Sequence, residues 1–128
     1  MVDQMSLDIA GLDYPNKKGP PRRFELAMCS PGEAVALKPE PKNPADPQAV
    51  AIYSCRGIQL GYVRAERAPL IRTYLSRARI TAAVFQCVTE HGALIRIALD
   101  GAELRLPPPQ PKSSEAPDFY PDYDQGWD

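Results

Sequence analysis

The sequence predicts a mainly β fold, a small OB-like barrel in which six or so short strands are interrupted by one amphipathic helix. Apolar and polar side chains alternate along several short runs, and glycine, proline or aspartate marks the turn after most of them. One stretch, residues 66–78, has helical rather than strand spacing. A second, shorter helix is predicted nearer the N-terminus.

The alternating runs that predict strands cover residues 7–12, 34–38, 49–53, 58–62, 79–89, 93–99 and 104–106. In the second run, Val35 and Leu37 are expected to face inward. Residues 79–89 and 93–99 carry apolar side chains on both faces, which is typical of strands near the centre of a barrel. The Asp100-Gly101 pair is a hairpin signal, so the run after it is predicted to be a short last strand.

A proline-rich loop and the hairpin after it, residues 39–62, organise the rest of the chain. The loop PEPKNPADP holds four prolines, which make it rigid, and it leads into the strand AVAIY. The turn SCRG and a second run, IQLGY, complete the unit. Strict alternation in this second run places Ile58, Leu60 and Tyr62 on one face.

Two stretches have helical spacing. In RRFELAMC, Phe24 and Met28 lie four residues apart, which predicts the short helix. The apolar face of the longer helix consists of Ala68, Ile71, Leu75 and Ala78. Pro69 is tolerated only near a helix start, so this helix is predicted to begin near Ala65 or Glu66.

Length and charge predict one domain and a tail. The chain has 128 residues, and five of its 15 prolines lie between Pro107 and Pro117. We therefore predict a domain over residues 1–106 and a disordered, Pro-rich, acidic and aromatic tail over 107–128. The net charge of −1 hides an asymmetry, because residues 1–106 carry 14 basic and 11 acidic side chains, a net charge of +3.

Side chains that support catalysis or metal binding are sparse. Cys29, Cys55 and Cys87 form no CxxC pair and His91 is the only histidine, so we expect no disulfide framework, no zinc site and no cofactor. Because the sequence has neither a GxSxG elbow nor a glycine-rich phosphate loop, we expect a binding protein rather than an enzyme. No leader-like or membrane-spanning run is present, and free cysteines fit a cytoplasmic location.

The hairpin unit resembles the HIRAN domain, a small module found alone in bacteria and fused to chromatin-remodelling helicases and nucleases in eukaryotes. The resemblance rests on Glu40-Pro41, Asn43-Pro44-Ala45-Asp46, Ala49-Val50, Gly57 and Gly61-Tyr62-Val63, in that order. It extends over about Leu7 to Leu106. It implies a six-stranded OB-like barrel with a helix packed on it.

The resemblance also implies binding of single-stranded DNA at a 3′ end, with bases stacked on aromatic rings and the terminal hydroxyl held by an aspartate. The aspartate corresponds to Asp46 and one stacking ring to Tyr14. The DNA-binding residues that we expect are Tyr14, Lys42, Asn43, Asp46, Tyr62, Arg64 and Arg67. The implied setting is DNA repair or replication-fork processing, with a helicase or nuclease supplied in trans.

Two positions depart from the family pattern, and they keep a second function open. Asp13 stands where the family has a phosphate-binding arginine, and Ala45 stands where it has a second stacking ring. The alternative is a protein-interaction or regulatory domain that has lost DNA-end reading. The Asp46-Pro47 pair is also a common turn initiator.

Two charged stretches have alternative interpretations as well. Five arginines on and around the longer helix form either a solvated face or a phosphate track: Arg64, Arg67, Arg72, Arg77 and Arg79. The tail interleaves acids with aromatic residues after residue 117. It is a solubilising segment, a segment that competes with nucleic acid for the basic face, or a short linear motif for another protein.

Overall fold

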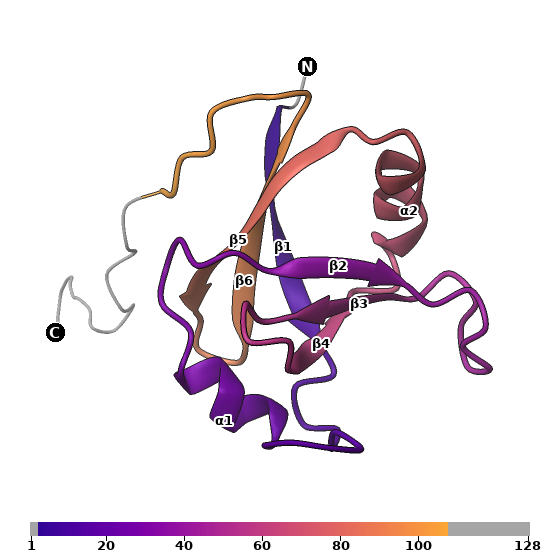
Figure 1. The fold of residues 1–128 in the computed structure, drawn as a ribbon, viewed down its shortest axis with the longest axis vertical. Helices are drawn as coiled ribbons and strands as arrows, with labels where there is room; N and C mark the ends of the chain where they lie inside the picture. Colours follow the sequence, from indigo (N-terminus) through magenta and orange to yellow (C-terminus); the bar gives the residue numbers. More distant parts are fainter. Residues whose placement is uncertain (1–2, 108–128) are drawn as a thin grey trace, which may run out of the picture.

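A computed structural model describes residues 3–107, which form six strands and two helices (Figure 1). The strands are β1 (Gln4–Ala10), β2 (Ala36–Pro39), β3 (Val50–Tyr53), β4 (Gln59–Val63), β5 (Ile80–Val88) and β6 (Ala93–Leu99), and the helices are α1 (Arg22–Ala27) and α2 (Ala68–Ser76). The predicted fold class is confirmed. Strand β1 begins earlier than predicted, and the predicted tail from residue 108 on lies outside the described residues.

All six strands pair antiparallel in one sheet, in the order β2-β3-β4-β1-β6-β5. The sheet curls strongly, so that β2, β3 and β4 cross the long strands β1, β5 and β6 (Figure 1). Backbone hydrogen bonds join β5, at one edge of the sheet, to the residues just before β2, the strand at the other edge. Phe85 of β5 accepts from the Gly32 N–H at 2.8 Å and donates to the Glu33 carbonyl at 2.7 Å. The result is a curled half-barrel, which agrees with the OB-like barrel that the sequence predicts.

The core consists of apolar side chains from five strands and both helices. Its buried members include Leu7, Ile9, Leu26, Val50, Ile52, Leu60, Val63, Ile71, Phe85, Ile95, Ile97 and Leu99. Val35 and Leu37 are half-buried and pack against this cluster, so their predicted inward direction is confirmed. Burying a large apolar side chain stabilises a fold by roughly 1.5–3 kcal/mol, so this cluster is the main source of stability.

Helix α1 leaves exposed the two apolar side chains whose spacing predicts it and buries two charged ones. Phe24 and Met28 are 60% and 54% exposed, whereas Arg22 and Glu25 are buried. Polar partners from distant segments explain this reversal. Glu25, for example, pairs with Arg56 of the β3–β4 turn at 2.6 Å. Spacing along one helix does not reveal such partners.

Helix α2 is shorter than predicted at both ends. Residues 65–67 form a turn before it, and Ala78 has a φ of +53°, a left-handed conformation that a helix does not continue through. Ala68 and Ile71 are buried, which confirms the predicted inner face over the remaining turns. Neither helix in residues 3–107 has the length and apolar character needed to span a membrane.

Strand β4 breaks the strict alternation that the sequence predicts. The register of the β3–β4 pair shifts at the end of β3, and a bulge of this kind changes which residues face the core. Leu60 is fully buried, and the next residue, Gly61, lies opposite the core residue Ile52. Tyr62 therefore points to the other face, and the prediction that it shares a face with Leu60 is wrong.

No strand follows the Asp100-Gly101 turn up to residue 107, so the predicted last strand is wrong. Both sides of β6 are already paired, with β1 and with β5, which leaves no edge for a further strand. The chain instead bonds to the side chain of Gln4. That amide donates to the Glu103 carbonyl at 2.9 Å and accepts from the Arg105 N–H at 2.8 Å.

Candidate nucleic-acid interface

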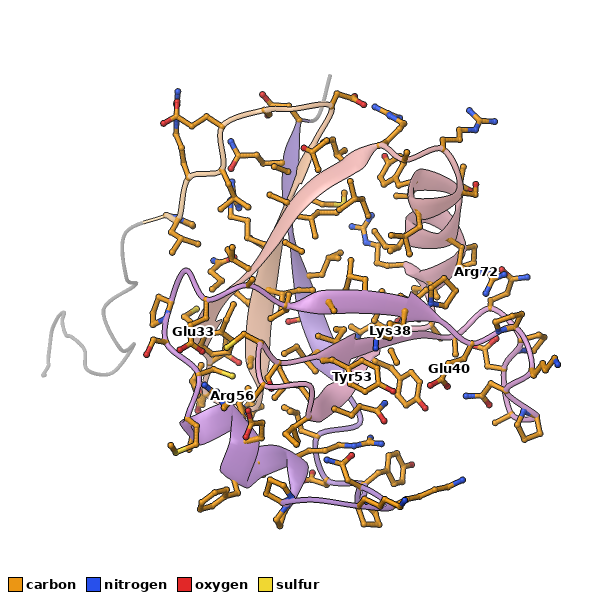
Figure 2. All side chains as sticks on the ribbon, in the orientation of Figure 1. Glu33, Lys38, Glu40, Tyr53, Arg56 and Arg72 are labelled. Atoms are coloured by element: carbon orange, nitrogen blue, oxygen red, sulfur yellow. The ribbon has the colours of Figure 1, made fainter. Side chains whose placement is uncertain are left out.

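The outer face of β2, β3 and β4 carries aromatic and cationic side chains (Figure 2). Lys38, Ala51 and Tyr62 lie opposite one another across the three strands. The Lys38 amine is 4.7 Å from the centroid of the Tyr53 ring, and Figure 2 shows this pair beside Glu40. Burial raises the pKa of the Tyr53 phenol. Rings beside cations suit nucleobases and phosphates.

Arg22, the first residue of α1, is a buried cation at the edge of this face. It is 6% exposed, and its guanidinium donates to the Asn16 side chain and to the Gly11 carbonyl, both at 2.8 Å. The guanidinium carbon lies 5.6 Å from the centroid of the Tyr62 ring. Among residues 3–107 no carboxylate forms an ion pair with it. A buried charge without a counter-charge is costly, so this position favours an incoming anion.

The turn after β1 brings Tyr14 close to Arg22 and Tyr62. Gly11 has a φ of +78°, and its carbonyl accepts from the Tyr14 N–H at 3.2 Å. A Cβ added to Gly11 would lie 3.4 Å from Tyr14, 3.4 Å from Arg22 and 3.8 Å from Tyr62. The three side chains therefore surround Gly11. Tyr14 is 69% exposed, so most of its ring is open to a ligand.

Asp13 is neutralised by a cation from α1. Arg23 bonds to both carboxylate oxygens, with Nη2 3.3 Å from Oδ2. The hydrogen bond from Arg23 lowers the pKa of Asp13 and raises the pKa of the arginine. The sequence alone presents Asp13 as an acid that repels phosphate. Its pairing with Arg23 offsets that charge beside Tyr14.

Glu40 fixes the proline-rich loop to the strand that carries Tyr62. One of its carboxylate oxygens accepts from the Tyr62 hydroxyl at 2.9 Å and from the Asn43 side-chain amide at 3.0 Å. Its N–H donates to the Ala49 carbonyl at 2.9 Å, which closes the loop. Residues 40–49 are therefore held in one position relative to the rings on β4.

Inside this loop, Asn43 and Asp46 cap backbone groups. The Asn43 side-chain oxygen accepts from the N–H groups of Ala45 and Asp46 at 2.9 and 3.2 Å. One carboxylate oxygen of Asp46 accepts a hydrogen bond from the Gln48 N–H at 2.9 Å, so Asp46 stabilises the turn, as the Asp46-Pro47 pair predicts. In the described part of the chain the second oxygen accepts no hydrogen bond. Lys42 and Ala45 are exposed on the same loop.

Arg64 and Arg67 belong to a neighbouring hollow rather than to this surface. The hollow has a volume of about 200 Å³ and is lined by Ser6, Leu7, Asp8, Val63, Arg64, Glu66 and Arg67. Arg64 pairs with Glu66 at 3.5 Å, and the pKa of Glu66 is lowered first by a hydrogen bond to its own backbone and then by this arginine. Because Asp8 adds a second carboxylate, the hollow is a weaker anion site than its arginines suggest.

The remaining arginines of the predicted phosphate track are partly engaged. Arg79 pairs with Asp100 at 2.7 Å, and Arg72 donates to the Pro47 carbonyl at 3.2 Å (Figure 2). The second contact joins α2 to the proline-rich loop. Arg77 is exposed. The basic face is therefore a set of separate cations and not a continuous track.

Of the residues that the sequence singles out, Tyr14 and Tyr62 lie on either side of Gly11, and Glu40 joins Asn43 to Tyr62. Asp46 bonds to Asn43 within the proline-rich loop, and Arg64 and Arg67 line the separate hollow. Sequence reasoning missed Arg22, Lys38 and Glu40 as members of the surface. Glu40 had a signal, because it lies in the motif that carries the family resemblance. The run PPRRF gives no sign that its first arginine is buried. No three or more histidine, cysteine, aspartate or glutamate side chains in residues 3–107 form a metal site.

Comparisons with known proteins agree with the fold and the motif. The family profile of the HIRAN domain matches residues 3–100. The crystal structure of the HIRAN domain of human HLTF has a TM-score of 0.58 at 18% identity, and the match covers 76% of this chain and 74% of that one. A crystal structure of a protein from Lactobacillus plantarum has a TM-score of 0.58 at 17% identity, covering 77% and 89%. No curated protein matches the sequence.

Proposed function

Because the chain belongs to the HIRAN domain family, which is known for DNA binding, we propose that it is a DNA-binding module that takes the end of a single strand. The ligand lies across Tyr14 and Tyr62, with its backbone toward Arg22 and its terminus toward Asp46. The module binds and does not catalyse. Its setting is DNA repair or fork processing, where a helicase or nuclease acts on the bound end.

The observation that carries this proposal is a buried cation that has no carboxylate partner in residues 3–107 and lies beside the Tyr62 ring. Arg22 is 6% exposed, touches the Tyr62 ring and has no carboxylate partner within residues 3–107. A phosphate supplies the missing negative charge, and the adjacent rings supply stacking at roughly 1–3 kcal/mol per base. Exposure of Tyr14 leaves this stacking surface accessible.

Recognition of a 3′-hydroxyl is supported by the second oxygen of Asp46. The first oxygen holds the Gln48 N–H, so the carboxylate is fixed in direction by the loop itself. The second oxygen accepts no protein hydrogen bond within residues 3–107. A carboxylate accepts a hydrogen bond from a hydroxyl and repels a terminal phosphate.

Two exposed rings provide a matched test. Tyr14 lies in the proposed interface and Phe24 lies on the outer face of α1, and they are 69% and 60% exposed. Fluorescence anisotropy of a short single-stranded oligonucleotide is titrated with wild type, Tyr14→Leu and Phe24→Leu at two salt concentrations. We expect Tyr14→Leu to weaken binding about tenfold, because one stacked base is lost. Phe24→Leu is expected to bind as wild type.

Binding that falls with salt identifies phosphate contacts. Equal losses in the two variants would contradict the assignment of the interface, because a general surface effect does not distinguish the rings. Undetectable binding of wild type at low salt would contradict DNA binding itself.

Protein interaction is a second candidate, favoured by the outer face of α1. Phe24 and Met28 lie four residues apart and are both more than half exposed, an uncommon arrangement for a face that contacts only water. On this alternative, Phe24→Ala abolishes binding of a purified partner protein and Tyr14→Leu does not. Variants at Phe24 and Tyr14 therefore distinguish protein interaction from DNA binding.

A further inference from the structure

Two cysteines that are distant in the sequence share one arginine. Cys29 follows α1, and Cys55 lies in the turn between β3 and β4. The Cys29 sulfur lies 3.7 Å from Nη2 of Arg56, and the Cys55 sulfur lies 3.7 Å from Nη1 of the same guanidinium. Both thiols are free. The fold therefore places two thiol groups against the two ends of a single cation.

The arginine is anchored independently of the thiols. Its Nε donates to the Glu25 carboxylate at 2.6 Å, and that carboxylate is 4% exposed. Figure 2 shows Arg56 beside Glu33, whose carboxylate is 3.6 Å from Nη2 and 3.7 Å from the Cys55 sulfur. Because the guanidinium is planar and rigid, its nitrogens cannot move separately; each cysteine can instead turn about χ1 and move its sulfur off the arginine while the pair between Nε and Glu25 stays in place. The sulfurs can then approach each other.

The two thiols differ in access. Cys55 is exposed, whereas Cys29 is half-buried and its sulfur also donates to the Glu25 carbonyl at 3.5 Å. Burial raises the pKa of the Cys29 thiol, and the nearby Arg56 opposes this rise. A dissolved reagent therefore reaches Cys55 first. A cation beside a thiol stabilises its thiolate, the form that attacks disulfides.

We propose that Cys29 and Cys55 form a thiol–disulfide exchange site that is oxidised by a small disulfide such as glutathione disulfide. The Cys55 thiolate attacks one sulfur of the small disulfide, which gives a mixed disulfide and releases one small thiolate that takes up a proton. The Cys29 thiolate then attacks the Cys55 sulfur and expels the second small thiol. The protein loses two hydrogen atoms, and one small disulfide becomes two thiols.

The oxidised pair ties the end of α1 to the β3–β4 turn. Both elements are packed together in the reduced protein through Glu25 and Arg56, so the new bond links segments that are already neighbours. The thiol–disulfide exchange site is independent of DNA binding, because none of its side chains belongs to the proposed DNA interface. Cys87, half-buried on β5, has no contact with Arg56 in the described residues and serves as an internal comparison.

The test incubates the full chain with glutathione disulfide, blocks free thiols and identifies linked peptides by mass spectrometry. Wild type is expected to lose two hydrogen atoms and to link Cys29 with Cys55. Cys29→Ser is expected to stop at glutathione on Cys55, and Cys55→Ser to react at least tenfold more slowly. A bond that includes Cys87, or wild type that retains glutathione on Cys55, would overturn the proposal.

The role of the arginine needs a variant that keeps the fold. Arg56→Met leaves the buried Glu25 without a partner and is prone to unfold, so Arg56→Lys is tested beside it with circular dichroism as the folding control. Arg56→Lys keeps a cation near Cys55 and is expected to react within threefold of wild type. A folded Arg56→Met protein is expected to react about tenfold more slowly, and an unchanged rate in that protein would exclude the arginine from the reaction.

Discussion

Arg22 combines a structural and a binding role in one side chain. Its two hydrogen bonds, to Asn16 and to the Gly11 carbonyl, fix the turn that positions Tyr14. Its charge remains without a carboxylate partner among residues 3–107. In the sequence it is one of two adjacent arginines, and only the fold separates them. Arg22 is buried, whereas Arg23 is exposed and pairs with Asp13.

Replacing Arg22 separates these roles. Arg22→Met leaves two acceptors without a donor, so we expect the free energy of unfolding to fall by about 1–3 kcal/mol, measured by urea denaturation. Oligonucleotide affinity is expected to fall about tenfold because a charged contact is lost. Arg77→Met removes the same charge from an exposed position and is expected to change neither quantity appreciably. Wild-type affinity in a destabilised Arg22→Met protein would leave the residue with a structural role alone.

At the scale of single elements, strand β4 shows how a bulge creates a binding face. The shift in the β3–β4 register turns Tyr62 outward while Leu60 and Val63 remain in the core. Gly61 makes this possible, because a side chain there would collide with β1. The IQLGY pattern predicts a strand correctly. It contains no signal for the bulge, because the bulge depends on pairing with β3.

Gly61→Ala tests the close approach of β1 and β4. A Cβ at this position would lie 2.3 Å from the Ala10 carbonyl oxygen and 2.8 Å from Ile9, so the backbone must move. We expect a loss of more than about 2 kcal/mol in urea denaturation. Gly92→Ala is the matched control, because its Cβ would meet nothing closer than 3.6 Å and is expected to be neutral. Equal stability of the two variants would contradict the packing of β1 on β4.

Helix α1 and the chain after β6 show what local patterns miss. Apolar spacing locates α1 correctly but does not reveal its buried polar side chains, because Glu25 pairs with Arg56 of the β3–β4 turn and Arg22 bonds to Asn16 in the loop before the helix. The Asp100-Gly101 signal locates a turn correctly, with φ values of +56° and +80°. The strand after it does not form, because pairing partners are set by the whole sheet.

For the whole molecule, alternation and turn chemistry were enough to predict a small OB-like barrel, because each run carries its own signal. The bounds of β6, residues 93–99, match the prediction. The candidate site was predicted in part, through the motif residues Asn43, Asp46 and Tyr62. Tyr14 was predicted from the family resemblance, whereas Arg22 of α1 and Lys38 of β2 could not be found from spacing, because only the fold brings these elements to the surface.

The distribution of charge over the whole molecule predicts that the C-terminal segment weakens oligonucleotide binding. Residues 1–106 carry a net charge of +3, whereas the whole chain carries −1. Removing everything after Leu106 is therefore expected to raise oligonucleotide affinity several-fold at low salt, measured by anisotropy. The difference is expected to shrink as salt is added, because screening weakens long-range repulsion. Equal affinities at low salt would exclude competition by this segment.

The most direct test of the central claim compares single-stranded oligonucleotides that end in a 3′-hydroxyl or a 3′-phosphate. The proteins are wild type, Asp46→Asn and Asp3→Asn. Asparagine at 46 can still accept the hydrogen bond from Gln48, and it removes the negative charge. Asp3→Asn is the control, because it removes one negative charge just before the first residue of β1, whereas the proposed interface includes the turn after the last residue of β1. We predict that wild type and Asp3→Asn prefer the hydroxyl end and that Asp46→Asn loses this preference. Equal binding of both ends by wild type would contradict end recognition and leave only a cationic surface.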